Sequence, residues 1–147
     1  MIFTLQAREI ACNVLAPSLT DEIVCELRSI SFFSACYDAS NKGNAKMLPI
    51  AVQFFSRFGI RRGILDFIEQ SDESADALFK NIKYVLEAHE LKLEQLASLG
   101  SDNTNVNVGD YHSVFSLFEE LLPKVVKGKM ILKSELVSIT SFFIHLI

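Results

Sequence analysis

The sequence predicts a mixed α/β domain, in which a sheet of antiparallel and parallel strands has helices packed against it. Two apolar runs, 47–55 and 60–68, are joined by the short turn 56–59, which predicts an antiparallel hairpin. Further along, a helical pattern over 72–91 leads into a strand-like run at 96–101. A strand–helix–strand connection of this length makes a parallel, right-handed crossover, so the sheet has strands of both directions.

Composition supports one folded chain inside the cell. The 147 residues are 50% hydrophobic and 22% charged, which suits a single domain and excludes a disordered chain. The formal charge of −4 argues against a protein that coats nucleic acid by bulk electrostatics, although a local basic patch remains compatible with it. The chain start lacks the apolar stretch of a signal peptide, and the final run 137–147 is too short to span a bilayer. We therefore expect an intracellular protein, nuclear or cytoplasmic, without membrane contact.

The N-terminal third predicts helices followed by the first strand. Segments 4–15 and 21–27 have the pattern of two short helices, with Ser18 or Thr20 as the N-cap of the second. They are expected to cover one edge or face of the sheet. Residues 31–38 alternate between apolar and polar and predict a strand.

The second half predicts two helices and two strands. The helix over 72–91 is amphipathic and begins with acidic residues, and a second helix over 114–122 should be closed by Pro123. Residues 125–132 predict a last strand, whose lysines would protect an exposed edge or contact DNA. The expected organisation is N-terminal helices at 1–30, a core at 31–132 and a divergent tail at 133–147. The apolar tail is expected to fold back over the sheet or to cause aggregation.

Two aspartates end predicted strands and are the candidate site. Asp38 follows the first strand, and Asp102 follows the strand at 96–101. If the first three strands form a meander and the helix crosses back beside the first strand, the two carboxylates become neighbours. Paired carboxylates at adjacent strand ends suit the binding of Mg²⁺ in phosphoryl chemistry. The alternative is structural, because aspartates at strand ends are also common turn formers and helix caps.

Other chemical motifs are weaker. The string SNKGN at 40–44 could cradle a phosphate but lacks the glycine spacing of a P-loop. His89 and His112 have no partner acids at ligand spacing, and no catalytic triad with a nucleophile can be assembled. Cys12, Cys25 and Cys36 match neither zinc-ligand spacings nor an even disulfide framework. We expect no small-molecule substrate.

Three longer strings resemble hAT-type transposase-derived proteins of animal genomes. They are YDASNKGNAKMLPIAVQFF at 37–55, LDFIEQSDESADAL at 65–78 and GSDNTNVNVGDYHSVFSLF at 100–118. The likeness runs in register from about Arg8 to Val126, and three separated blocks in the right order make chance improbable. The resemblance implies the N-terminal part of an RNase H-like catalytic core, present here in incomplete form.

The same resemblance implies a site and its partners. Asp38 and Asp102 would be the first two acids of the family's metal-binding triad, which holds Mg²⁺ or Mn²⁺ for cleavage and strand transfer in DNA transposition. The third acid, a glutamate on a late helix, has no counterpart, because Glu119, Glu120 and Glu135 fall in the wrong elements. The resemblance therefore implies a truncated or domesticated core that binds metal weakly, has DNA as its partner and lacks catalytic activity on its own. The alternatives are a non-catalytic module that binds DNA or a protein, and a gene remnant with no selected function.

Overall fold

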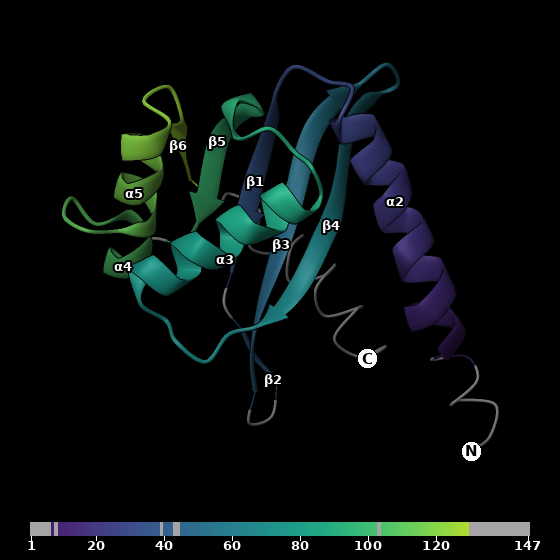
Figure 1. Cartoon of the computed structure of the whole chain (residues 1–147), viewed down its shortest axis with the longest axis horizontal. Helices are drawn as coiled ribbons and strands as arrows, with labels where there is room; N and C mark the ends of the chain where they lie inside the picture. Colours follow the sequence, from purple (N-terminus) through teal and green to yellow (C-terminus); the bar gives the residue numbers. More distant parts are fainter. Residues whose placement is uncertain (1–6, 8, 39, 43–44, 103, 130–147) are drawn as a thin grey trace.

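A computed structural model of the chain describes residues 7, 9–38, 40–42, 45–102 and 104–129. Its centre is one mixed sheet, with β4, β3 and β1 antiparallel and β1, β5 and β6 parallel, in the spatial order β4-β3-β1-β5-β6 (Figure 1). This arrangement confirms the predicted fold class, a meander extended by parallel strands and flanked by helices. The strands are β1 (Phe33–Tyr37), β2 (Ser40–Lys42), β3 (Ala45–Ser56), β4 (Gly59–Glu69), β5 (Leu96–Ser101) and β6 (Val126–Lys129).

The short strand β2 is the strand that the sequence did not predict. It pairs with the start of β3 in the register that β1 would reach by continuing, because Tyr37 lies opposite Ile50 and Ser40 opposite Met47. Residues 40–42 therefore extend the antiparallel pairing of β1 with β3 and do not form a phosphate-binding loop. Asp38 lies directly at the break between the two strands.

The N-terminal segment forms one continuous helical stretch, so the prediction of two short helices is wrong. A π-helical turn, η1 (Ala11–Leu15), leads directly into α2 (Ala16–Leu27). Pro17 directly follows the π-helical turn, and the helical stretch continues through it. Thr20 is consequently inside the helix rather than at its cap, and its hydroxyl donates to the carbonyl of Ile64 at 3.4 Å.

The predicted helices of the second half are confirmed with small changes at their ends. They are α3 (Ala75–Ala88) and α5 (Val114–Leu121), and the one-turn helices η2 (Leu93–Gln95) and α4 (Asn105–Val108) lie between them in the chain. Ser74 caps α3 by accepting from the N–H of Ala77, and Ser113 forms a capping box with Ser116 at the start of α5.

All these longer helices pack on the same face of the sheet. The strand residues on that face are almost completely buried, and they pack in one core with the apolar sides of α2, α3 and α5. Phe79 of α3 meets Phe118 of α5 edge to face, with ring centroids 4.8 Å apart. The buried strand residues on this face include Phe33, Ala35, Tyr37, Ile50, Val52, Phe54 and Leu99.

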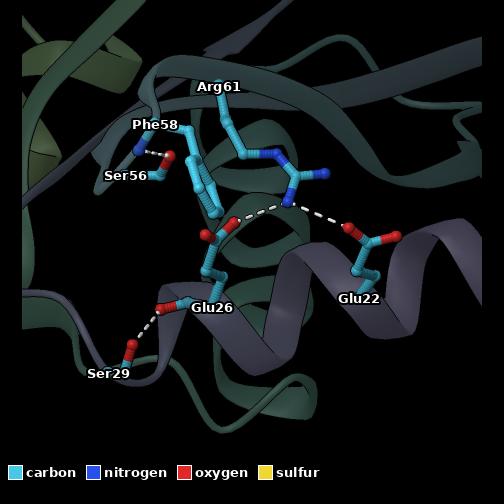
Figure 2. A network of polar contacts seen from close by, with 6 residues as sticks. All are labelled: Glu22, Glu26, Ser29, Ser56, Phe58 and Arg61. Atoms are coloured by element: carbon cyan, nitrogen blue, oxygen red, sulfur yellow. Dashed lines mark hydrogen bonds and ion pairs between the residues drawn. The ribbon is translucent and has the colours of Figure 1, made fainter.

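Helix α2 is held against β4 by close packing and by charge (Figure 2). Gly63 of β4 leaves room for Ile23, whose Cδ1 occupies the space that a side chain at position 63 would need. Nearby, the guanidinium of Arg61 reaches Glu22 at 3.0 Å and Glu26 at 2.8 Å, one helical turn apart on α2. The N-terminal helix therefore lies on the outer strand of the meander.

The last described strand, β6, extends the parallel half of the sheet as predicted. It pairs with β5, and the ammonium group of Lys127 donates to the carbonyl of Val108 at 2.6 Å. The same ammonium lies 5.6 Å from the ring centre of Phe115, so this lysine fastens the strand to the helices. The predicted continuation of the strand to residue 132 and the tail 133–147 lie outside the described residues. None of the described helices is long and apolar enough to cross a membrane.

Candidate functional site

Asp38 and Asp102 follow two strands that lie side by side. The parallel strands β1 and β5 pair with Cys36 opposite Gly100, each two residues before its aspartate. Both aspartates are partly buried. The predicted adjacency of the two strand ends is confirmed, because the α3 crossover returns the chain beside β1. The role of the two residues as metal ligands stays a prediction.

Both aspartates line one cleft at this edge of the sheet. Its volume is about 210 Å³, and its wall comes from the ends of β1 and β5, the segment before α3, the first turn of α3, and α4. The cleft therefore gathers segments that are far apart in the sequence. The lining residues are Tyr37, Asp38, Glu73, Leu78, Asp102, Thr104, Val106 and Asn107.

The carboxylate of Asp102 is held by the segment that follows it. Its Oδ1 accepts hydrogen bonds from the backbone N–H of Thr104 at 3.4 Å, from the Thr104 hydroxyl at 3.1 Å and from the side-chain amide of Asn107. These donors lie beside and within α4, so Asp102 also organises that short helix. The structural interpretation of this residue and the ligand interpretation are thus compatible.

Tyr37 lies under the cleft with its ring almost completely buried. Its hydroxyl donates to Oδ1 of Asn107 at 3.1 Å. Burial raises the pKa of Tyr37 far above its usual range; the hydrogen bond with Ser101 lowers it, and the negative charge of Asp102 raises it. The phenol therefore stays protonated and remains a hydrogen-bond donor at any physiological pH.

A third carboxylate reaches the wall of the cleft, but it has a different partner. Glu73 forms an ion pair with Lys46 of β3. Within the described part of the chain, no group of three acidic, histidine or cysteine side chains is close enough to hold a metal ion together. Asp38 and Asp102 are the other two carboxylates among the described residues that line the cleft.

The donor set of this pair fits a hard divalent cation. Mg²⁺ prefers carboxylate oxygens, keeps several waters and is often held by only one or two carboxylates. Among the described residues, every hydrogen bond to the Asp102 carboxylate goes to Oδ1, so Oδ2 is the oxygen that suits a ligand. Asp38 would supply the second carboxylate from the neighbouring strand end.

Other acidic side chains and one histidine have structural contacts. Asp66 accepts from the N–H of Phe67 at 2.7 Å, and Asp72 accepts from the N–H of Ser74 at 2.8 Å, which lowers the pKa of Asp72. His112 lies 2.6 Å from a carboxylate oxygen of Asp76 and so joins the starts of α5 and α3. His112 thus has a structural contact, and sequence spacing could not reveal its partner because Asp76 lies on a different helix.

Sequence reasoning missed Tyr37 and Asn107 as parts of this site. Tyr37 alternates with other apolar strand residues, so it has the pattern of a core residue. Asn107 belongs to a polar string, DNTNVN at 102–107, whose spacing from Asp102 matches no common motif. A short helix placed over the strand ends brings it back to Asp102, and that placement was the missing information.

The chain was compared with known proteins. No protein-family model matches it, and no curated protein is similar to it. Among solved structures, it is similar to a protein from Bacteroides thetaiotaomicron VPI-5482 described as having an actin-like ATPase fold and unknown function. The two share 13% sequence identity at a TM-score of 0.42, and the match covers 75% of this chain but only 37% of the other. By its fold and its cleft, the chain is a mixed α/β domain with two acids at the ends of adjacent parallel strands.

Proposed function

We propose that this chain is an hAT-like, transposase-derived core that binds a divalent cation and DNA without cleaving DNA on its own. The observation that carries the proposal is the position of Asp38 and Asp102, at the ends of neighbouring parallel strands and in one cleft. The strings that resemble the transposase family contain both residues. A nuclear location follows from DNA as the partner.

In this proposal the two aspartates have a binding role. A bound Mg²⁺ or Mn²⁺ would supply positive charge that attracts a phosphate group of the nucleic acid. Asp38 and Asp102 contribute carboxylate oxygens from the two strand ends, and the Asn107 amide and Thr104 keep the Asp102 carboxylate in one orientation. With Glu73 paired to Lys46, a third acidic ligand is lacking among the described residues that line the cleft, so binding is favoured over chemistry.

The first experiment measures cation binding. Mn²⁺ alone is titrated into the protein, and free Mn²⁺ is followed by electron paramagnetic resonance. We expect a single weak site in the millimolar range that is lost in Asp38→Asn and in Asp102→Asn. Asp66→Asn is the matched control, because that aspartate contacts its own strand. Wild-type protein that binds no Mn²⁺, or binding that survives the double variant Asp38→Asn, Asp102→Asn, would contradict the proposal.

The second experiment measures DNA binding. Fluorescence anisotropy with a short labelled duplex should show binding that increases when Mn²⁺ is added and that weakens in Asp38→Asn. The same duplex should remain uncut on a gel over hours. Cleavage that depends on Asp38 would show that the chain is an active enzyme. Cation binding without any DNA binding would favour the alternative, a module that contacts a protein.

A further inference from the structure

We infer that Tyr37 and Asn107 form a positioning relay that orients the Asp102 carboxylate for a divalent cation. This inference rests on the proposed cation site. It concerns two residues that would not contact the cation themselves. The relay consists of two consecutive hydrogen bonds, from the Tyr37 hydroxyl to Oδ1 of Asn107 and from Nδ2 of Asn107 to Oδ1 of Asp102.

The chemistry of the three groups permits one arrangement of the amide. A carboxylate can only accept, so the NH₂ group of Asn107 must point toward Asp102. The amide oxygen then points the other way and requires a donor, which the hydroxyl of Tyr37 provides at 3.1 Å. An amide flip would therefore break both hydrogen bonds, to Tyr37 and to Asp102.

The relay selects which oxygen of Asp102 is left for a ligand. The side-chain amide of Asn107 and both the backbone N–H and the hydroxyl of Thr104 donate to Oδ1 of Asp102. These hydrogen bonds fix the rotation of the carboxylate about its last bond. Oδ2 then keeps one direction in the cleft. Residues behind a metal ligand commonly act in this way, and changing them typically weakens metal affinity by about 10–100-fold.

The relay also connects the two halves of the site. Tyr37 is the last residue of β1 and directly precedes Asp38, whereas Asn107 lies on α4 beyond β5. A hydrogen bond between them ties the backbone next to one aspartate to the side chain that holds the other. The two carboxylates are therefore positioned relative to each other rather than separately.

The test uses Tyr37→Phe, which removes only the hydroxyl. We expect the Mn²⁺ dissociation constant to rise about tenfold, whereas the matched control Tyr84→Phe, at an exposed tyrosine of α3, leaves it unchanged. Asn107→Ser, which removes the middle group of the relay, should weaken Mn²⁺ binding in the same way. If Tyr37→Phe does not fold, Asn107→Ser on the half-buried side of α4 decides by the same measurement.

Three results are distinguishable. An unchanged dissociation constant in Tyr37→Phe, even with a lower melting temperature, would show that the hydroxyl only stabilises the fold and would overturn the relay. An unchanged dissociation constant in Asn107→Ser would overturn it as well, because both hydrogen bonds of the relay pass through Asn107. Wild-type protein without Mn²⁺ binding would overturn the proposed function, and the relay would fall with it.

Discussion

The two faces of the sheet differ in how completely the described residues cover them. On the helix-covered face, side chains such as Ile50 and Val52 of β3 are at most 1% exposed. On the opposite face of the same hairpin, Phe55 is 76% exposed and its cross-strand partner Ile60 is 55% exposed. Polar contacts cross this second face, where Arg62 donates to Gln53 at 2.7 Å.

This difference shows which part of the chain determines stability. A strand places alternate residues on opposite faces, so one run of sequence supplies both a dense core and an open surface. Burial of apolar area stabilises the fold through the core-facing residues and not through those on the open surface. The cleft with the two aspartates lies at the end of the strands, where both faces stop, and is supported by the covered face through Tyr37.

The largest expected effect comes from the same substitution made on each face. Phe118→Ala should lower the free energy of unfolding by about 3–5 kcal/mol, because it removes a completely buried ring that packs against Phe79. Phe55→Ala, at the exposed position of β3, should change it by less than about 0.5 kcal/mol. Urea denaturation measures both variants. Equal losses would show that the two faces are buried alike in solution.

A smaller effect is expected where α2 approaches the covered face. Gly63→Val should cost about 1–3 kcal/mol, because the new side chain would overlap Cδ1 of Ile23. Ile23→Val removes that methyl group, so the double variant should recover part of the loss. Thermal unfolding of the two single variants and the double variant gives the coupling. Strictly additive effects would mean that α2 does not rest on Gly63.

On the opposite face of the sheet, Cys36 should make the free energy of unfolding depend on pH. Burial raises the pKa of Cys36 to about 11 from 9.0, with the charge of Arg62 acting in the other direction. Since the folded state disfavours the thiolate, its contribution is complete below pH 9 and is lost as the pH rises through about 11. The loss should be on the order of 1–2 kcal/mol. The test is to measure the free energy of unfolding of wild type and Cys36→Ala between pH 8 and about 11. If this free energy falls by the same amount in both proteins, the Cys36 thiol is not the cause of the fall.

The smallest effect is expected at the surface of the α2–β4 contact. Arg61→Gln removes two ion pairs between these elements and should lower the urea midpoint slightly, by less at high salt because ions screen exposed charges. Lys83→Gln, which removes an ion pair with Glu87 within α3, is the control for a contact that joins no separate elements. A salt-independent loss in Arg61→Gln would indicate packing rather than charge.

Particular residues show how far the sequence could predict the site. Asp38 and Asp102 were identifiable because strand-like runs end directly before them, whereas the adjacency of their strands was an assumption about strand order that the structure confirms. Glu73 could be assigned to a helix start, but its ion pair with Lys46 depends on how the α3 segment passes the sheet. His112 was missed for the same reason, since Asp76 lies on another helix.

The sequence by itself determined the alternation of the strands and the amphipathic helices α3 and α5, because these depend on neighbours within about five positions along the chain. It also determined the mixed sheet, since connection lengths restrict strand direction. Only the tertiary structure decided that α2 continues through Pro17, that residues 40–42 form a strand and that Tyr37 bonds to Asn107. The contacts of α2 with β4 and of Tyr37 with Asn107 join residues that are distant in sequence, and their energy exists only after the chain has folded. The strand at 40–42 pairs with the nearby start of β3, in the register that β1 sets.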